Sequence, residues 1–184
     1  TLSNSDADTT ALDAGDSVTD TFTMTVSDGT ASDTMDVVIT VTGADDDVTA
    51  GADQTGAVTE DATATTATGT IAGSDADDAS SLAYTGDATG TYGAIAVVSG
   101  SGAWTYTLSN SDADTTALDA GDSVTDTFTM TVTDSASGET DTMAVTITIT
   151  GANDAPSAGS DGTGAVTEDA STSTSTGSIS ATDA

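Results

Sequence analysis

The sequence predicts an all-β protein made of tandem β-sandwich repeats, and three observations lead to that prediction. Apolar and polar residues alternate over short stretches, which is the period of a half-buried strand. Clusters of Ser, Asp and Gly separate these stretches, as hairpin turns do. Long blocks of the sequence also occur twice, which is typical of repeat architectures.

The expected strands follow from the alternation. Apolar residues alternate with Thr in residues 18–26 and, less regularly, in residues 35–41. The pattern returns in residues 143–149, and residues 104–108 place Trp, Tyr and Leu on one face. Because β-branched residues at a period of two favour strands that are buried on one side, we expect half-buried antiparallel strands almost throughout.

Turn signals divide these strands. Ser-Asp-Gly at 27–29 and Ser-Gly-Ser at 99–101 are typical of hairpin turns. Helical periodicity is nearly absent, and only Thr115 to Leu118 are expected to form a single turn. Six to eight short strands in a unit of about 107 residues fit a β-sandwich. Since aromatic residues make up 3% of the chain, we expect a core of mainly Val, Ile, Leu and Met, with Trp104 inside it.

The repeats give the expected domain organisation. Residues 1–26 recur without change at 107–132, an offset of 106, and residues 43–70 recur with substitutions at 151–178, an offset of 108. The difference of two residues falls at the tip of a hairpin. We therefore interpret the chain as a window from a longer tandem array, with three parts: residues 1–42 as the C-terminal part of a preceding repeat, 43–150 as one complete repeat, and 151–184 as the N-terminal part of a following repeat.

The charge of the chain excludes several classes of function. Its 184 residues include 31 Asp and Glu but no Lys, Arg, His or Cys, so its formal net charge is −31. Without Lys or Arg the chain cannot neutralise phosphates, which excludes nucleic acid and anionic membrane surfaces as partners. Without His or Cys it has no Ser-His-Asp triad, no thiol nucleophile and no zinc site, so we expect no enzyme. The longest apolar run, Ala94 to Val98, is too short to cross a membrane.

Five motifs carry a family resemblance: Gly-Thr-Tyr-Gly (90–93), Gly-Ala-Trp-Thr-Tyr-Thr-Leu (102–108), Ala-Leu-Asp-Ala-Gly-Asp (117–122), Thr-Asp-Thr-Phe-Thr-Met-Thr-Val (125–132) and Val-Thr-Ile-Thr-Ile-Thr-Gly-Ala-Asn-Asp-Ala-Pro (145–156). Together they resemble the VCBS repeat, which occurs in very large bacterial surface proteins and adhesins. The resemblance covers the complete repeat and both partial ones. It implies tandem arrays in an extracellular, cell-surface or matrix protein, an immunoglobulin-like or cadherin-like sandwich, and calcium-dependent adhesion.

The cadherin likeness extends to single motifs. Gly-Ala-Asn-Asp-Ala-Pro (151–156) resembles the cadherin linker that supplies calcium ligands between domains, and Val-Thr-Glu-Asp (58–61) lies where cadherins place a ligand Glu. Ser-Asp-Ala-Asp (74–77) resembles the cadherin Asp-x-Asp motif, and Leu-Asp-Ala-Gly-Asp (118–122) the Leu-Asp-Arg-Glu motif. The first linker departs from this pattern in residues 43–48, where Val replaces Pro and a further acid is present.

The acidic residues point to calcium independently. They gather in turns and linkers, while Thr dominates the outward strand faces, and no acid has a basic partner. Calcium takes six to eight oxygen ligands, carboxylates included. We therefore expect Ca2+ at the junctions between repeats. The ligands expected at the first junction are Asp13, Asp16, Asp45, Asp46, Asp75, Asp77 and Asp134. Those expected at the second are Glu60, Asp119, Asp122, Asn153, Asp154 and Asp183.

These observations predict a non-enzymatic, calcium-stiffened stalk or fibre segment of a large secreted bacterial surface protein. Its partners would be neighbouring repeats of the same chain, with homotypic assembly into fibres and surface glycans as further possibilities. Two alternatives stay open. One is a module that binds glycans or host surfaces. The other is an acidic spacer adapted to high salt, without specific metal sites, because high net charge alone keeps a protein soluble.

Overall fold

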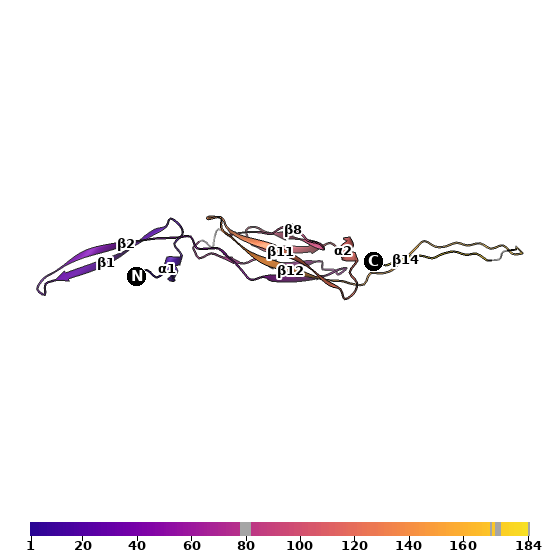
Figure 1. The fold of residues 1–184 in the computed structure, drawn as a ribbon, viewed down its shortest axis with the longest axis horizontal. Helices are drawn as coiled ribbons and strands as arrows, with labels where there is room; N and C mark the ends of the chain where they lie inside the picture. The colour runs from indigo at the N-terminus through magenta and orange to yellow at the C-terminus, as the bar shows by residue number, and fades with distance from the viewer. Residues whose placement is uncertain (78–81, 170, 172–173, 184) are drawn as a thin grey trace.

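The computed structural model describes residues 1–184 except 78–81, 170, 172–173 and 184. Three parts follow one another along the molecule: a two-stranded hairpin, a β-sandwich and a long open loop (Figure 1). The elements are α1 (Ala7–Thr10), β1 (Ser17–Ser27), β2 (Ser32–Thr42), β3 (Thr49–Ala50), β4 (Gln54–Thr59), β5 (Thr66–Thr70), β6 (Gly73–Ser74), β7 (Leu82–Thr85), β8 (Ala88–Thr89), β9 (Gly93–Val97), β10 (Ala103–Leu108), α2 (Ala113–Thr116), β11 (Ser123–Asp134), β12 (Thr140–Thr150), β13 (Ser157–Ala158) and β14 (Ala181–Thr182).

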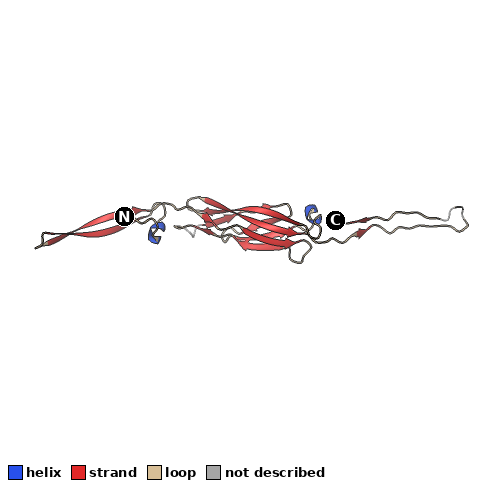
Figure 2. Ribbon diagram, turned by 60° about the horizontal axis from the view of Figure 1, so that its bottom comes forward, coloured by secondary structure: helices blue, strands red, loops and turns tan. Residues whose placement is uncertain are grey.

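The central part is a sandwich of two four-stranded sheets (Figure 2). Their strand orders are β5-β10-β9-β8 and β4-β12-β11-β7. This confirms the predicted all-β sandwich. The expectation of antiparallel pairing is wrong for one pair, because β4 runs parallel to β12. The connection explains this pairing. After β4 the chain crosses to β5 in the opposite sheet, so β4 forms no hairpin with the next strand and pairs with the free edge of β12 instead.

The core fills the space between the two sheets. Its apolar members are Val48, Val58, Ile71, Ile95, Trp104, Tyr106, Leu108, Leu118, Phe128, Met130, Val132, Met143, Val145, Ile147 and Ile149. Trp104 is 2% exposed, and its Nε1 donates a hydrogen bond to Gln54 Oε1 at 2.8 Å. A Cβ at Gly69 would lie 2.6 Å from the indole ring, so the ring requires glycine on the neighbouring strand. The prediction that Trp104 is a core residue is confirmed.

The hairpin β1–β2 repeats the hairpin β11–β12 in detail. Ser17 pairs with Thr42 in the first, as Ser123 pairs with Thr150 in the second. At the other end of the first hairpin, Ser27 pairs with Ser32 across a tip of four residues. In β11–β12 the pair is Thr133 with Thr140, so six residues lie between. The two offsets found in the sequence therefore do reflect a hairpin tip of variable length.

The helices are single turns. Asp112 caps α2, since its carboxylate accepts a hydrogen bond from the Asp114 backbone N–H at 3.0 Å. The turn predicted at residues 115–118 therefore forms at Ala113–Thr116, because the cap fixes where the helix begins. In the part of the chain that the structure describes, no helix is long and apolar enough to cross a membrane.

Candidate metal centre

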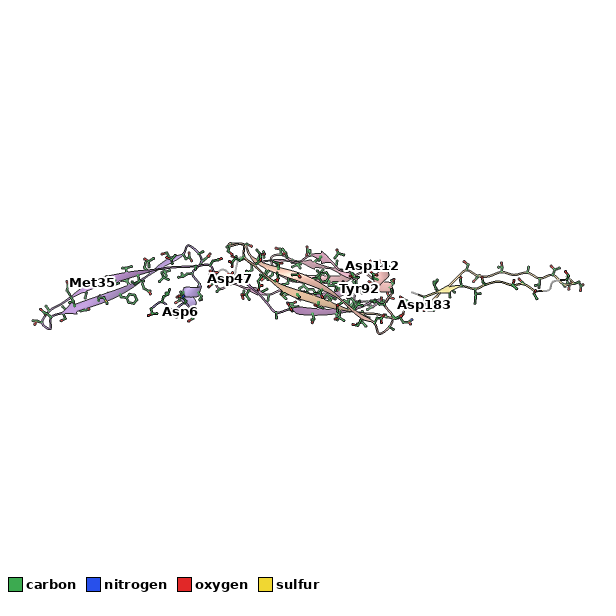
Figure 3. The ribbon with its side chains drawn as sticks, viewed as in Figure 1. Asp6, Met35, Asp47, Tyr92, Asp112 and Asp183 are labelled. Carbon is green, nitrogen blue, oxygen red and sulfur yellow. The ribbon has the colours of Figure 1, made fainter. Side chains whose placement is uncertain are left out.

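Three carboxylates meet at the first junction, between the β1–β2 hairpin and the sandwich. Asp13 precedes β1, Asp45 follows β2 and Asp77 follows β6. One carboxylate oxygen from each lies within 4.8 Å of the others. Asp47, labelled in Figure 3, marks the place of this junction in the molecule. The three residues come from three separate segments, so the tertiary fold assembles the cluster.

Backbone contacts shape the turn that brings Asp13 to the end of β2. The Asp13 carbonyl accepts a hydrogen bond from the Asp16 N–H at 2.9 Å, and the Asp16 carbonyl accepts one from the Gly43 N–H at 2.9 Å. A Cβ at Gly43 would lie 2.3 Å from the Asp13 carbonyl oxygen, so only glycine permits this approach. Asp16 thus serves the junction through its backbone, and its carboxylate is not part of the three-residue cluster.

The remaining predicted residues of this junction surround the cluster. Asp77 Oδ2 accepts from the Asp46 N–H at 3.0 Å, and Asp75 Oδ1 accepts from the Asp77 N–H at 3.2 Å. Asp134 ends β11 and is 2% exposed, and its carboxylate accepts from the N–H groups of two residues in the following turn. Asp46 therefore helps to orient Asp77 through its backbone, while the side chain of Asp46 lies outside the cluster.

The acids of the first junction repel one another. Asp45 is exposed, but desolvation by its neighbours raises its pKa, and the negative charges of Asp77, Asp13, Asp134 and Asp75 raise it further, in that order. The chain has no Lys, Arg or His to compensate this charge. A cation bound among these oxygens would remove the repulsion.

The sequence analysis missed Glu139. It lies exposed between β11 and β12, where desolvation is the largest cause that raises its pKa, and the carboxyl groups of Asp47, Asp45 and Asp75 raise it further. Glu139 and Asp47 line an open pocket of about 470 Å³ together with Val48, Thr49 and their neighbours in β12. Asp47 stands out in the sequence as an extra acid in the linker. Glu139 carries no such signal, because it sits in a hairpin tip that differs between the two copies.

The second junction lies at the other end of the sandwich, where Figure 3 labels Asp183. Burial raises the pKa of Asp154, and the nearby charges of Asp61, Asp183 and Asp119 raise it further. The sequence analysis named the last two of these but missed Asp61. Among the described residues, no group of three carboxylates here is as compact as the one at the first junction.

The other predicted residues of the second junction are held by hydrogen bonds. Glu60 is 3% exposed, and its Oε1 accepts from the Ala152 N–H at 2.7 Å. Asp122 Oδ2 accepts from the Asp119 N–H at 3.1 Å. Asn153 donates from Nδ2 to the Asp154 carbonyl. The structure therefore brings Asp119, Asp154 and Asp183 within electrostatic reach, while Glu60, Asp122 and Asn153 make contacts that shape the junction.

The donor set at the first junction fits calcium. Calcium binds oxygen at about 2.3–2.6 Å, so two ligands on opposite sides of one ion lie about 5 Å apart. The cluster of Asp13, Asp45 and Asp77, with oxygens within 4.8 Å, meets that requirement. It offers only carboxylate oxygen, which suits a hard cation and not the nitrogen and sulfur preference of zinc.

Another buried carboxylate, Asp126 in β11, has a purely structural environment. It is 4% exposed and accepts hydrogen bonds from Tyr106 Oη at 2.9 Å, the Thr91 N–H at 2.9 Å and the Tyr92 N–H at 3.1 Å. Burial raises the pKa of Tyr106, and its hydrogen bond to Asp126 raises it further. Asp126 therefore anchors the loop before β9 to the core.

Comparison with solved structures gives cadherin domains among the matches. Mouse clustered protocadherin PcdhgC3, domains EC1–3, matches with a TM-score of 0.51 at 18% identity, over 86% of this chain and 50% of that one. Protocadherin PcdhgB3, domains EC1–4, matches with a TM-score of 0.48 at 19% identity, over 84% and 37%. The chain thus spans at most half of the length of these structures. The match to PcdhgC3 supports the fold and no functional conclusion.

An endo-fucoidan hydrolase of glycoside hydrolase family 107 also matches, at 19% identity over 77% of this chain and 19% of that one. Its TM-score of 0.35 is too low to carry an argument about activity. Comparison with the curated proteins gives no match. The family model of the bacterial cadherin-like domain matches residues 45–151, which is more than half of the chain. The chain therefore belongs to the bacterial cadherin-like domain family.

Proposed function

We propose that this chain is a calcium-stiffened, non-enzymatic stalk or fibre segment of a large secreted bacterial surface protein. The observation that carries the proposal is the cluster of Asp13, Asp45 and Asp77, whose oxygens lie within 4.8 Å with no basic residue in the chain. Membership of a cadherin-like family supports the adhesive, extracellular role. The alternative of a glycan-binding module gains no support from Trp104, because its ring is buried and not available for a sugar to stack on.

The proposed ligands at the first junction are the cluster itself with Asp75 and Asp134, supported by the backbone of Asp16 and Asp46. The proposed ligands at the second junction are Asp119, Asp154 and Asp183, with Asp61 added and with Glu60, Asp122 and Asn153 around them. A cation at each place would neutralise acids that now raise one another's pKa.

The repeat organisation belongs to the same proposal. We assign residues 43–150 to one complete repeat of the VCBS type, residues 1–42 to the repeat before it and residues 151–184 to the repeat after it. In that arrangement each acidic cluster lies where two repeats meet. Its partners are then neighbouring repeats in the same chain, and calcium fixes the angle between them.

Calcium titration of the 184-residue chain tests the proposal. Small-angle scattering follows the length of the particle, and thermal unfolding follows its stability, both at fixed high ionic strength. We expect calcium, but not an equal concentration of magnesium, to lengthen the particle and raise the melting temperature. Calcium at ten times its dissociation constant adds about 1.4 kcal/mol per site. If sodium chloride alone produces the same stiffness, the acids are a salt adaptation and the metal proposal fails.

A matched pair of variants isolates the first junction. Asp45→Asn removes one charge from the cluster, and Asp20→Asn removes one charge from the exposed face of β1. Both variants have the same net charge. We expect only Asp45→Asn to weaken calcium binding, by about tenfold or more. Equal effects of the two variants would show that calcium responds to net charge and not to this cluster.

A further inference from the structure

An open cavity of about 360 Å³ lies on the sandwich near α2, and none of the proposed calcium ligands lines it. Its walls are residues 89–94, which lead from β8 into β9, residues 107–109 at the end of β10, and Asp112 before α2. Figure 3 labels Tyr92 and Asp112 at this end of the sandwich. A cavity of this volume can hold a small organic ligand.

Hydrogen bonds hold the walls of this cavity in place. The N–H groups of Thr91 and Tyr92 donate to the buried carboxylate of Asp126 at 2.9 and 3.1 Å. The Tyr92 carbonyl accepts from the Ser109 N–H at 2.9 Å, and the Ser109 carbonyl accepts from the Asp112 N–H at 3.1 Å. The three walls are thus linked to one another and to the core. A cavity that is formed before its ligand arrives lowers the cost of binding.

The uncharged groups of the cavity suit a sugar ring. Tyr92 is half-buried, packs against the core cluster and lines the cavity, so it offers an aromatic side chain at the wall. Four exposed residues of the walls carry hydroxyl groups: Thr89, Thr91, Thr107 and Ser109. Hydroxyl groups can exchange hydrogen bonds with the hydroxyl groups of a sugar, and an aromatic side chain can pack against its C–H face.

Asp112 gives the cavity a negative charge. Its Oδ1 accepts from the Asp114 N–H at 3.0 Å, while its Oδ2 takes part in no hydrogen bond found among the described residues. The chain has 31 acidic residues and no Lys, Arg or His, so no cation of the protein competes for this oxygen. The same charge repels sulfated and uronic sugars. Charge complementarity therefore favours a ligand that carries a positive charge.

We propose that this cavity binds an amino sugar with a free ammonium group. The ammonium group pairs with Asp112, the sugar hydroxyls bond with those of the walls, and one face of the ring packs on Tyr92. This binding is a further function beside that of a stalk, and it requires no metal. Residues 107–112 recur unchanged at 1–6. An array of repeats would therefore hold a polymer of such sugars at several points, which strengthens individually weak binding.

The next repeat leaves the cavity open in the proposed repeat organisation. The first junction shows how a complete sandwich follows the segment that corresponds to residues 107–112. There Asp6, the counterpart of Asp112, is exposed, and so are residues 3–5 before it. The same arrangement at the second junction would leave Asp112 accessible. The other walls belong to the interior of the complete repeat, so the cavity does not depend on where the chain begins or ends.

An NMR titration of the 184-residue chain in the presence of a calcium chelator tests this binding. The probe is a glucosamine disaccharide at a mildly acidic pH that keeps its amines protonated. Its diacetylated form has the rings without the charge, and putrescine has two charges without a ring. We expect the probe to shift the amide signals of Tyr92, Ser109 and Asp112 and to bind about tenfold more tightly than either comparison. Absence of binding, or equally tight binding of a comparison compound, would overturn the proposal. Because calcium is removed, either result leaves the calcium proposal unaffected.

Matched variants separate the cavity from the net charge of the chain. Asp112 and Asp6 cap single-turn helices in identical sequence blocks, and Asn caps a helix as well as Asp does. Asp112→Asn and Asp6→Asn therefore lose the same charge and keep the cap. Only Asp112→Asn should weaken binding, by about tenfold or more, because no copy of residues 89–94 accompanies Asp6 in this chain. Equal losses in the two variants would show attraction to net charge and would overturn the proposal.

Tyr92→Leu tests the aromatic wall, because it keeps an apolar side chain at the core and removes the ring. It should weaken binding about three- to tenfold, whereas Tyr92→Phe, which keeps the ring, should bind as the unchanged chain does. Unfolding followed by the fluorescence of the buried Trp104 verifies that each variant is folded. Undiminished binding by a folded Tyr92→Leu chain would also overturn the proposal.

Discussion

Replacing Asp126 by Ala should destabilise the sandwich strongly, while the same change at Asp20 should leave its stability unchanged. The two residues occupy the same place in identical sequence blocks. Asp126 is buried and accepts three hydrogen bonds. Asp20 lies in a strand whose residues are all exposed. The pair therefore separates the effect of tertiary burial from that of local sequence.

The expected magnitude follows from the groups that lose their acceptor. Asp126→Ala leaves the Tyr106 hydroxyl and the N–H groups of Thr91 and Tyr92 without the carboxylate. A buried donor without an acceptor costs about 1–3 kcal/mol. The loop sits tightly on the carboxylate, because a Cβ at Gly90 would lie 2.4 Å from Asp126 Oδ2. Some relaxation of the loop lowers the sum, so we expect a loss of about 3–5 kcal/mol.

Urea unfolding followed by Trp104 fluorescence measures this difference, because Trp104 is buried in the same core. Tyr106→Phe removes only one of the three hydrogen bonds and should cost about 1–2 kcal/mol. Combined with Asp126→Ala it should add little, since the two residues share one contact. A loss below about 1 kcal/mol for Asp126→Ala, or an equal loss for Asp20→Ala, would refute the reasoning.

Three further predictions concern the packing around the core and junctions. Asp141→Ala should lower the melting temperature more than Asp33→Ala, because only Asp141 accepts from the Ala50 N–H, at 2.8 Å. The hydrogen bonds that Asp141 accepts from the Ala50 and Thr142 N–H groups also lower its pKa. The stability that Asp141 contributes should therefore be present above its ordinary pKa of 3.8 and be lost on acidification, as melting temperatures measured against pH would show. Gly151→Ala should disturb the second junction, because the new Cβ would lie 2.3 Å from a carbonyl oxygen. Small-angle scattering should then show a less extended particle, and an unchanged particle would contradict the prediction. Stability should fall as the pH rises above 10.0, because folding raises the pKa of Tyr106, and Tyr106→Phe should flatten that alkaline slope.

Much of the fold follows from the sequence by local rules. The alternation in residues 18–26 and 143–149 places strands correctly, because a period of two leaves few other ways to bury apolar side chains. The identical blocks also predict the shared register of the two hairpins, and the differing offsets predict their differing tips. The parallel pairing of β4 with β12 was not predictable in this way, since it depends on which sheet the following strand joins.

The candidate site was likewise predictable only where local sequence patterns decide the position of a residue. Asp45 and Asp77 lie in linkers and turns where a cadherin resemblance places ligands, and they do meet Asp13. Glu139 and Asp61 were missed because each reaches its junction through tertiary folding: Glu139 from a hairpin tip, and Asp61 from a turn in which it has a positive φ. The buried role of Asp126 was missed because its block is identical to that of the exposed Asp20.

At the proposed sites, calcium would act on the joints and not on the packing that holds the sandwich together. Asp13, Asp45 and Asp77 lie on segments before β1, after β2 and after β6, so the cluster exists only when the hairpin and the sandwich are both folded and correctly placed. The sandwich core lies between its own two sheets and contains none of these three acids. An ion at the proposed site therefore stabilises the angle of the joint more than the fold of either part. Removing that ion should loosen the joint while the core around Trp104 remains intact, which is the order of events that the proposed stalk function requires.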